Sequence, residues 1–436
     1  MQHIDLKNIK HVHFIGIGGI GISAVARMMM IEGKKVTGND LDEFEMVQAL
    51  RSFGVNTVIG KDPSSIPAGV DLIVYSIAWT TLGPELLEYA LTLGIPVVSY
   101  PEMLHIVTEG KYTIAVAGTH GKTTTAAMIT QILRDAQKDP SVIIGSLLVN
   151  EKSNFIAGKS EYFIVEACEY RRSFLNINPT ILVITNIDED HLDYYKDIED
   201  IKSAFRELAL KVPAQGFIVC SKTDPHIKDV IEGVSAKVID YDANFNPHLS
   251  LKIPGIHNKR NAAAAYGVGK ILSIPPSEIE KSLGAFKGTW RRFEYKGMLS
   301  SGALIYDDYA HHPVEIVATL QGFRELYPKD EGWKITVLFQ PHLFSRTKAL
   351  LSEFAESFKD ADKVLILPIY QAREEDDGTI SAKILADKIV NSQSLSFNNF
   401  EEAQSYIKAQ TYSSKDIIIT MGAGEAFKIG DSLLEV

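Results

Sequence analysis

Short apolar segments alternate with helical patterns along nearly the whole chain, and this alternation restricts the possible folds more than any other feature. The segments are continuous and rich in β-branched residues, which is typical of strands buried on both faces of a parallel sheet. Parallel neighbours need right-handed crossover connections, which are usually helices. The pattern predicts an α/β fold with doubly wound, mostly parallel sheets, whose strands include residues 12–17, 71–77, 112–118, 162–167, 181–187, 217–220, 335–340, 363–370 and 416–424.

Two changes of pattern divide the chain of 436 residues into three predicted domains. A polar stretch at residues 107–111 precedes a new strand with a glycine-rich loop, and a second break at residues 287–292 precedes a fresh set of strands. Residues 241–256 are rich in Asn and Pro and are predicted to form a loop. We therefore expect three α/β domains at residues 1–108, 109–290 and 291–436.

The charge balance and the cysteine count exclude several classes of protein. Lys and Arg number 44 against 55 Asp and Glu, so the formal net charge is −11. An acidic chain is a poor nucleic-acid binder, because that affinity depends on neutralising phosphates. Two cysteines cannot form a disulfide scaffold, and no apolar stretch approaches the ~18 residues of a membrane span. We expect a cytoplasmic protein with neither nucleic-acid nor membrane partners.

A glycine-rich turn follows the first predicted strand. Gly16, Gly18 and Gly21 fit the spacing G-x-G-x-x-G, and a helical pattern follows them. Such a turn lets a diphosphate approach a helix N-terminus, and Asp40 stands where an acid that binds ribose is expected. NAD and a UDP-sugar are both compatible ligands. A turn that serves only strand–helix packing is the alternative.

A second glycine-rich loop follows the strand that begins at residue 112. In this loop Lys122 is predicted to reach the outer phosphates of a nucleotide, and the Thr123 hydroxyl to bind Mg²⁺. The loop departs from the standard P-loop pattern, because Val116 stands where a glycine is expected. The predicted phosphate-binding residues are Gly118, Thr119, His120, Gly121, Lys122, Thr123 and Thr124.

Polar side chains end two further apolar strands and are candidates for a cation site. Glu166 ends one strand, and a second strand is followed by Asn186, Asp188, Asp190 and His191. The carboxyl ends of parallel strands converge on one edge of a sheet, so these groups are expected near the phosphate loop. A cation would compensate the buried charge of Glu166. Helix capping by Glu166 and a structural role for the histidine remain alternatives.

Several motifs in fixed order resemble those of the Mur ligases, the ATP-dependent amide-forming enzymes of peptidoglycan precursor synthesis. The motifs are HFIGIGGIG, GTHGKTTT, EACEYRRSFL, TNIDEDHLD, GIHNKRNAAAA, GTWRRFE, DDYAHHP and QPHLFSRT, and the resemblance covers nearly the whole chain. It implies a Rossmann-like UDP-sugar domain, a central P-loop domain and a C-terminal Rossmann-like domain. It also implies ATP and Mg²⁺ as cosubstrate and cofactor, and an acyl-phosphate intermediate that an amino group attacks. The segments DDYAHHP and QPHLFSRT are most similar to the branch that joins L-alanine to UDP-N-acetylmuramate.

The resemblance also implies roles for individual residues. The predicted catalytic residues are Lys122 on the β- and γ-phosphates, Glu166 with Thr123 on one Mg²⁺, and His191 on a second metal. UDP-sugar binding is carried over to Gly16, Gly18, Gly19, Gly21 and Asp40. Further ATP contacts are carried over to Asn258 and Asn261, to Arg292 on the phosphates and to Asp308 on the ribose. Without the resemblance, Arg291 and Arg292 would be interpreted as a solvated basic pair.

Residues around the amino acid are carried over to the third domain, namely Tyr309, His311, His342 and Arg346. The sequence departs from the family pattern in three places. Leu343 replaces a second basic residue, and Trp79 replaces a small residue on the uracil side. Arg206 stands where other branches have a carbamylated lysine, with Lys202 near it, so that modification is not expected.

Three alternatives remain open at this point. An NAD-dependent oxidoreductase would explain the first glycine turn alone, and a regulatory ATPase only the second. A ligase that joins a whole tripeptide to UDP-N-acetylmuramate would share most of the motifs. Zinc at His311 and His312 is disfavoured, because no cysteine or third histidine lies at metal spacing. The protein is expected to act on small molecules as a monomer or weak homodimer.

Overall fold

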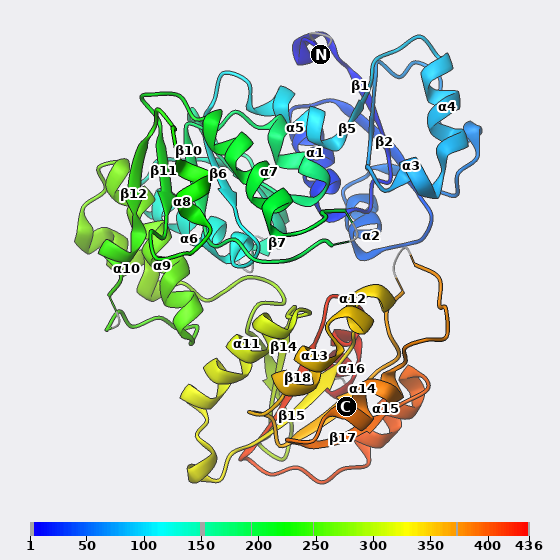
Figure 1. Ribbon diagram of the computed structural model, residues 1–436. Helices are drawn as coiled ribbons and strands as arrows, with labels where there is room; N and C mark the ends of the chain where they lie inside the picture. The colour runs from blue at the N-terminus through cyan, green and yellow to red at the C-terminus, as the bar shows by residue number, and fades with distance from the viewer. Residues whose placement is uncertain (1–3, 149–152, 193, 247, 372–373, 435–436) are drawn as a thin grey trace. The chain divides into compact units, whose positions relative to one another are not determined.

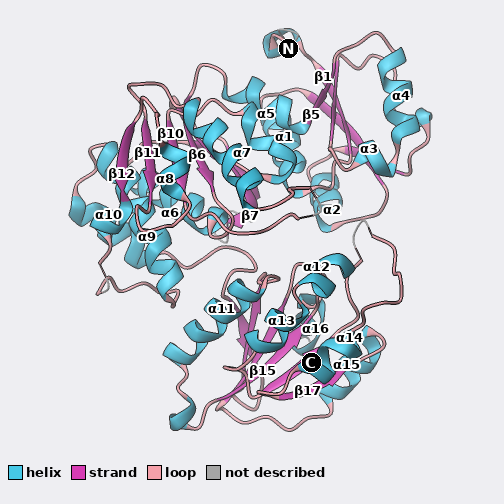
Figure 2. Ribbon diagram, in the orientation of Figure 1, coloured by secondary structure: helices cyan, strands magenta, loops and turns pink. Residues whose placement is uncertain are grey.

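The computed structural model describes residues 4–148, 153–192, 194–246, 248–371 and 374–434 (Figure 1). The chain forms two compact units. Unit 1 comprises Met1–Phe245 and Arg260–Leu283, and unit 2 comprises Asn246–Lys259 and Gly284–Val436. Unit 1 holds two β-sheets and unit 2 holds one, and each sheet is mostly or wholly parallel with helices on its faces (Figure 2). The α/β class predicted from the sequence is confirmed.

The first sheet of unit 1 has five parallel strands in the order β3-β2-β1-β4-β5. Helix α5 begins with a capping box, in which the Ser99 hydroxyl and the Glu102 carboxylate each bond the backbone of the other residue. The strands are His11–Ile15, Lys35–Asp40, Asn56–Ile59, Leu72–Tyr75 and Val97–Ser99. Helices α1 to α5 are Ile20–Ile31, Glu45–Ser52, Trp79–Leu82, Pro84–Thr92 and Tyr100–Thr108, and the 3₁₀ helices η1 and η2 are Leu6–Asn8 and Pro63–Ser65.

The second sheet has the order β12-β11-β10-β6-β9-β7-β8, with only β8 antiparallel to its neighbour. Strand β6 lies between β9 and β10, so the loop after β6 is flanked by the carboxyl ends of both. Strands β6 to β12 are Tyr112–Ala117, Ser141–Leu148, Ser153–Ile156, Tyr162–Glu166, Ile181–Ile184, Phe217–Cys220 and Lys237–Asp240. The helices are α6 Lys122–Asp135, η3 Tyr170–Asn176, α7 Ile198–Leu210, α8 Ile227–Ile231, η4 Tyr241–Asn244, α9 Ile256–Ile271 and α10 Pro276–Ala285.

The two sheets of unit 1 share one hydrophobic core. Helix α1, which follows the first glycine turn, packs against strands β7 and β8 of the second sheet. The Asn154 side chain on β8 donates hydrogen bonds to the Ile20 carbonyl at 2.5 Å and to the Ser23 hydroxyl at 2.9 Å. This contact fixes the first turn of α1, and with it the glycine turn, to the second sheet.

The sheet of unit 2 has the order β13-β14-β18-β15-β16-β17, and only β13 is antiparallel to its neighbour. Hydrophobic cores cover both faces, one beneath α11, α13 and α14 and the other beneath α15 and α16. Strands β13 to β18 are Glu294–Met298, Leu304–Asp308, Lys334–Phe339, Lys363–Ile366, Gln393–Ser396 and Asp416–Met421. Helices α11 to α16 are Pro313–Leu326, Phe344–Ala349, Leu351–Ser357, Ala382–Lys388, Phe400–Lys408 and Phe427–Leu434, and η5 is Lys329–Glu331.

All nine apolar segments predicted as strands contain one in the structure, although several end earlier than predicted. The predicted loop at residues 241–256 contains only the short η4 and the first residue of α9 among its described residues. In the described part of the chain, no helix has the length and apolar character needed to cross a membrane.

Candidate active site

The first glycine turn connects β1 to α1 and is shaped by close contacts. Gly16 has φ +80°, and a Cβ there would overlap the Trp79 indole. The backbone N–H of Gly18 donates to Asp40 Oδ2 at 2.7 Å. Trp79 is 2% exposed and packs in the core of the first sheet, with its indole against Gly16 of the turn. The turn can therefore accept only glycine at position 16.

Asp40, predicted to contact the UDP-sugar, uses both of its carboxylate oxygens within the protein. Oδ2 accepts from Gly18, and Oδ1 accepts from the backbone N–H of Leu41 at 2.8 Å. Burial raises the pKa of this carboxyl above its ordinary value. Asp40 thus holds the glycine turn in shape, and its contact with a ligand stays a prediction.

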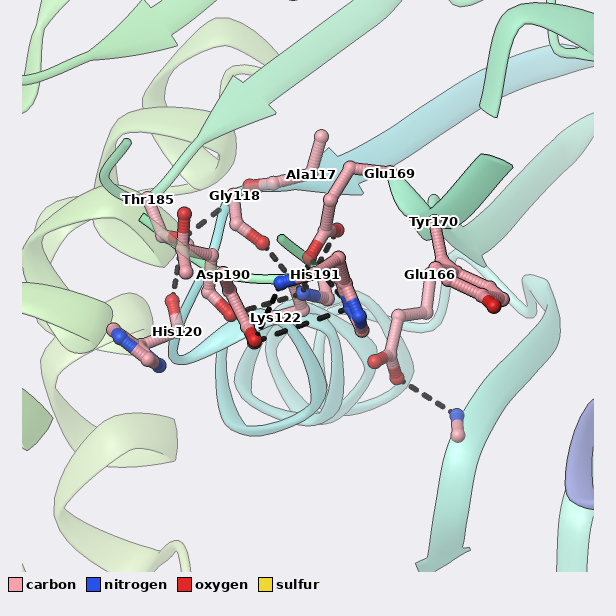
Figure 3. Close-up of polar contacts among 12 residues, drawn as sticks. Ala117, Gly118, His120, Lys122, Glu166, Glu169, Tyr170, Thr185, Asp190 and His191 are labelled. Atoms are coloured by element: carbon pink, nitrogen blue, oxygen red, sulfur yellow. Dashed lines mark hydrogen bonds and ion pairs between the residues drawn. The ribbon is translucent and has the colours of Figure 1, made fainter. Parts of the chain in front are cut away.

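The second glycine loop lies between β6 and α6 (Figure 3). Gly118 has φ +133° and Gly121 has φ +82°, a region that favours glycine. A Cβ on Gly118 would overlap the Thr185 hydroxyl, and one on Gly121 would overlap the Asn261 amide oxygen. Val116 is buried within β6, which explains why the loop begins two residues later than the standard motif.

The ammonium group of Lys122 lies at the centre of this loop. It donates to the carbonyls of Gly118 at 2.5 Å and Thr119 at 3.0 Å, and to Glu169 Oε1 at 3.0 Å. Burial alone would lower the pKa of Lys122, but Glu169, Cys168 and Glu166 together outweigh this effect, and the pKa is raised. The lysine is therefore charged and held where phosphates of a nucleotide are expected.

Glu169 was not predicted as a site residue, although it lies at the centre of the site. It follows β9 by three residues and is buried, and its carbonyl accepts from the Tyr195 hydroxyl at 2.5 Å. Figure 3 shows its side chain directed toward Lys122 and His191. Its place directly after an apolar strand, within the motif EACEYRRSFL, could have indicated that this glutamate belongs to the site.

Glu166 and Thr123, the two predicted ligands of the first Mg²⁺, lie side by side. The Thr123 hydroxyl donates to the Glu166 carboxylate at 2.9 and 3.0 Å. The backbone N–H of Gly145 on β7 donates to Glu166 Oε2 at 2.7 Å and fixes the carboxylate. A hydroxyl and a carboxylate beside a phosphate loop are hard oxygen donors that suit Mg²⁺.

His191, the predicted ligand of a second metal, lies on the other side of Glu169. Its Nε2 is 3.6 Å from Glu169 Oε1 and 3.9 Å from Asp190 Oδ2, and its ring packs on Tyr170 with centroids 4.8 Å apart. Its backbone has φ 55°, which turns the side chain back toward the loop. In the described ranges no three His, Cys, Asp or Glu side chains form a ready metal cluster.

Residues that follow β10 brace the loop through its backbone. Asn186 accepts from the His120 N–H at 2.9 Å and donates to the His120 carbonyl at 3.0 Å. The Thr119 hydroxyl bonds both the carbonyl and the N–H of Asp188, at 3.2 and 2.9 Å. The Asn186 side chain and the Asp188 backbone thus shape the phosphate loop.

Helix α9 carries both predicted asparagines, as their spacing indicates. Asn261 lies against Gly121 in unit 1. Asn258 belongs to unit 2, where its side-chain amide donates to the Pro254 carbonyl at 2.6 Å. Lys202 on α7 is paired with Glu199 at 2.8 Å and with Asp229 at 2.5 Å.

In unit 2, Asp308 ends β14 and is buried. Its carboxylate accepts from the N–H groups of Phe293 at 2.7 Å and Ala310 at 2.9 Å, and from the Thr319 hydroxyl at 3.2 Å. Burial outweighs these donors and raises the pKa of Asp308 to about 6. The carboxylate therefore orders the start of the third domain, and its predicted contact with ribose stays a prediction.

The interpretation of Arg291 and Arg292 as a solvated pair is wrong for Arg291. That guanidinium is buried, pairs with Asp307 at 2.7 Å, and donates to the carbonyls of Gly422 and Gly424. Arg292 instead lies over the Tyr309 ring at 5.0 Å, with Nη1 3.9 Å from Glu315 Oε1. The left-handed backbone of Arg291, φ 57°, sends the two side chains in different directions.

The residues predicted to surround the amino acid gather at the carboxyl ends of β14 and β15. The ring centroids of Tyr309 and His311 are 5.4 Å apart, and those of His311 and His342 are 5.8 Å apart. His342 stacks on Tyr370 at 5.7 Å. Arg346 lies in α12, which begins two residues after His342. Leu343, between His342 and the helix, is buried.

Comparisons with known proteins identify the family. Residues 11–112, 116–247 and 291–424 match models described as "Mur ligase family, catalytic domain", "Mur ligase middle domain" and "Mur ligase, glutamate ligase domain". A UDP-N-acetylmuramate–L-alanine ligase of Caldanaerobacter subterraneus is 40% identical, with 100% of this chain and 99% of that protein covered. The chain belongs to the Mur ligase family. The resemblance inferred from the motifs is confirmed.

Other Mur ligases extend the comparison. A UDP-N-acetylmuramate–L-alanine ligase of Alkaliphilus metalliredigens is 40% identical, with 99% of this chain and 98% of that protein covered. The crystal structure of the UDP-N-acetylmuramate–alanine ligase of Thermotoga maritima has a TM-score of 0.82 at 25% identity, with 98% of both chains covered. A murein peptide ligase of Psychrobacter arcticus shares the fold, with a TM-score of 0.73 at 24% identity and 98% of both chains covered.

Proposed function

We propose that this Mur ligase joins L-alanine to the carboxylate of UDP-N-acetylmuramate, with conversion of ATP to ADP and phosphate. The observation that carries the proposal is the cluster of Lys122, Thr123 and Glu166 around the phosphate loop. The relatives that are 40% identical over the full chain are ligases for L-alanine and supply the choice of substrates. The role in peptidoglycan synthesis follows from those substrates.

Each predicted domain takes one part of the reaction in this proposal. Residues 1–108 hold the UDP-sugar at the glycine turn, residues 109–290 bind ATP, and residues 291–436 receive the amino acid. Lys122 moves its charge from Glu169 to the β- and γ-phosphates when ATP binds, because both partners are anionic. Within residues 291–436, Arg292 and Asp308 are assigned to ATP, and Tyr309, His311, His342 and Arg346 to L-alanine.

The residues near the phosphate loop fit Mg²⁺. Thr123 and Glu166 offer a hydroxyl and a carboxylate, and Mg²⁺ is commonly held by one or two protein oxygens together with phosphates and water. His191 is the candidate ligand for a second ion, with its Nε2 facing the carboxylates of Glu169 and Asp190. The bound ion would reduce the repulsion between the substrate carboxylate and the phosphates. The fixed positive charge of Lys122 would reduce the same repulsion.

Release of phosphate with UDP-N-acetylmuramate and a panel of amino acids and peptides tests the proposal. We expect ADP and phosphate in a one-to-one ratio, with L-alanine the preferred acceptor. AMP and diphosphate as products would contradict the proposed chemistry. A preference for the tripeptide over L-alanine would assign the chain to the recycling reaction instead.

We further propose a cytoplasmic protein that acts on small molecules as a monomer or weak homodimer. The net charge of −11 disfavours a nucleic-acid partner. Light scattering coupled to size-exclusion chromatography measures the oligomeric state, and fractionation of the source cells locates the protein.

A further inference from the structure

The imidazole of His311 is held in one tautomer by the loop that follows β14. Its Nδ1 lies 3.0 Å from the Tyr309 carbonyl and 3.4 Å from Glu315 Oε2. Both atoms are hydrogen-bond acceptors, so the proton of the neutral ring belongs on Nδ1. Nε2 therefore carries the lone pair, which is the arrangement that a proton acceptor needs.

The carboxylate of Glu315 is itself fixed in position. It lies in the first turn of α11, and its Oε2 also accepts from the backbone N–H of His311 at 3.0 Å. Its Oε1 is 3.9 Å from Arg292 Nη1. The side chain is 14% exposed, so little solvent screens its charge. Glu315 can thus hold the His311 ring and stabilise it when it becomes positive.

We propose that His311 is the base that removes a proton from the ammonium group of the incoming amino acid, and that Glu315 positions it. The proposal rests on the assignment of this part of unit 2 to the amino acid under Proposed function. His311 touches the substrate in this scheme and is a catalytic residue. Glu315 acts through His311 and is a positioning residue.

A base is required because an amino acid arrives as a zwitterion whose ammonium nitrogen has no lone pair. His311 Nε2 takes one proton and leaves a neutral amine. The amine nitrogen forms a bond to the acyl carbon, and the bond from that carbon to the phosphate oxygen breaks. The second proton leaves the nitrogen with the departing phosphate, and His311 returns its proton to solvent. The acyl phosphate comes from the ATP-dependent step, so no further reactant is needed.

In the described contacts, other titratable and charged groups near His311 are arranged differently. His342 stacks on Tyr370, and Arg292 lies over the Tyr309 ring. His257 experiences the charge of Glu315, but burial lowers its pKa to about 4. Of these groups, His311 alone has a ring nitrogen that faces a carbonyl and a carboxylate in the described contacts.

Hydroxylamine separates proton removal from the rest of the reaction. It is largely uncharged at neutral pH, so it attacks an acyl phosphate without an enzymic base and gives a hydroxamate that can be measured. We expect His311→Gln to lower kcat with saturating L-alanine by about 100-fold or more. The hydroxamate rate should fall far less, so that the ratio of amide to hydroxamate drops at least tenfold. His248→Gln, an exposed histidine elsewhere in unit 2, is the matched control and should leave the ratio unchanged.

Glu315→Gln gives a second readout that a merely structural role would not produce. Removal of the carboxylate takes a negative charge away from the ring, so the rise of kcat with pH should move to lower pH. The plateau of kcat should also fall, because the ring is less well oriented. Circular dichroism establishes that both variants are folded before the rates are compared.

Three results would overturn the inference. One is an equal loss of amide and hydroxamate in His311→Gln, and another is a raised KM for L-alanine with kcat unchanged. The third is a Glu315→Gln profile with no displacement along the pH axis. Absence of both products in the unaltered protein would instead reject the proposed function, so the two failures are distinguishable.

Discussion

The ammonium group of Lys122 lies 3.0 Å from the carboxylate of Glu169, and both side chains are largely shielded from solvent, with 14% and 4% exposed. The lysine is thus engaged by a carboxylate of the same unit. In the proposed function, ATP replaces Glu169 as the partner of Lys122. On that proposal, the pair links the stability of the loop to nucleotide binding.

We predict that Glu169→Gln destabilises the nucleotide-free protein and increases the stabilisation that ATP provides. Removing one partner of a buried ion pair leaves an uncompensated charge, which lowers the free energy of unfolding by about 3–5 kcal/mol. The phosphates of a bound nucleotide restore a negative partner without first having to break an ion pair. Thermal unfolding with and without a non-hydrolysable ATP analogue measures both effects.

The control for this prediction is Glu199→Gln, which removes one of the two carboxylate partners of Lys202, with 72% of the glutamate exposed. It should change neither the midpoint nor the nucleotide-induced shift, because exposed pairs contribute little. If both variants had the same unfolding midpoint and the same nucleotide-induced shift, the buried Lys122–Glu169 pair would contribute no more to stability than an exposed pair.

A second prediction assigns the first glycine turn to the UDP-sugar. Gly16→Ala forces a Cβ into the Trp79 indole at φ +80°, so the turn must move. We expect the KM for UDP-N-acetylmuramate to rise at least tenfold while the KM for ATP changes less than twofold. Gly33→Ala is the matched control, because Gly33 has φ +82° but nothing within 4 Å of a Cβ. A similar rise in both variants would attribute the effect to backbone strain alone.

The Thr123 hydroxyl should matter for the metal ion rather than for the fold. Thr123→Val keeps the shape of the side chain but removes the oxygen that lies 2.9 Å from Glu166 Oε2. We expect the Mg²⁺ concentration for half-maximal activity to rise about tenfold in this variant. Thr123→Ser retains the hydroxyl and should stay close to the unaltered protein. Equal Mg²⁺ dependence of the two variants would remove Thr123 from the metal site.

His13 should make unit 1 less stable as the pH falls. Burial lowers its pKa to about 4, against an ordinary value near 6.5, and its Nδ1 lies 3.0 Å from the Thr37 hydroxyl. The unfolded chain therefore binds the proton more readily, and stability is lost as the pH falls from about 6.5 to 4. The difference in pKa corresponds to about 3 kcal/mol.

The measurement for His13 is the thermal midpoint of His13→Gln and of the unaltered protein at pH 7 and pH 5. The variant should lose less stability between the two values, because it lacks the titrating ring. His248→Gln, in which an exposed histidine is removed, should keep the full pH dependence. Identical pH dependence in all three proteins would contradict the effect assigned to His13.

The sequence indicates the central strands and the phosphate loop, because both leave strong local signals. Strand β6 is a continuous apolar segment, and Gly121 and Lys122 follow it at recognisable spacing. Strand β13 was not predicted, because it pairs only with β14 and its residues are half-buried or exposed. Short edge strands such as β5 leave a similarly weak pattern.

Side-chain pairing within the site was harder to predict than the site itself. Glu169 meets Lys122 where the chain leaves β9, and just beyond it Arg171 and Arg172 have φ of 51° and 54°. The same applies to Arg291, whose left-handed backbone directs it into the core. The residues with positive φ here are all arginines and not glycines, so the sequence does not indicate these bends. Long-range contacts of this kind depend on the assembled sheet.

The last prediction concerns Arg346, which the proposed function places against the carboxylate of L-alanine. A guanidinium presents donors to two carboxylate oxygens, which suits a free amino acid. Removing one partner of a desolvated charge pair typically weakens binding by about 2–5 kcal/mol. That corresponds to roughly a 30- to 5000-fold change at 1.36 kcal/mol per decade. Arg346→Ala should therefore raise the KM for L-alanine at least 30-fold.

The KM for ATP should barely change in Arg346→Ala, since the phosphate loop lies in the central domain. Lys348→Ala is the matched control, because Lys348 lies in the same helix but is 55% exposed and pairs with Asp377. This variant removes a positive charge near Arg346 but keeps the Arg346 guanidinium, so the KM values for L-alanine and ATP should both stay unchanged. An equal rise of the two constants in Arg346→Ala, or an unchanged KM for L-alanine, would refute the assignment. The tripeptide would then be the acceptor to test next.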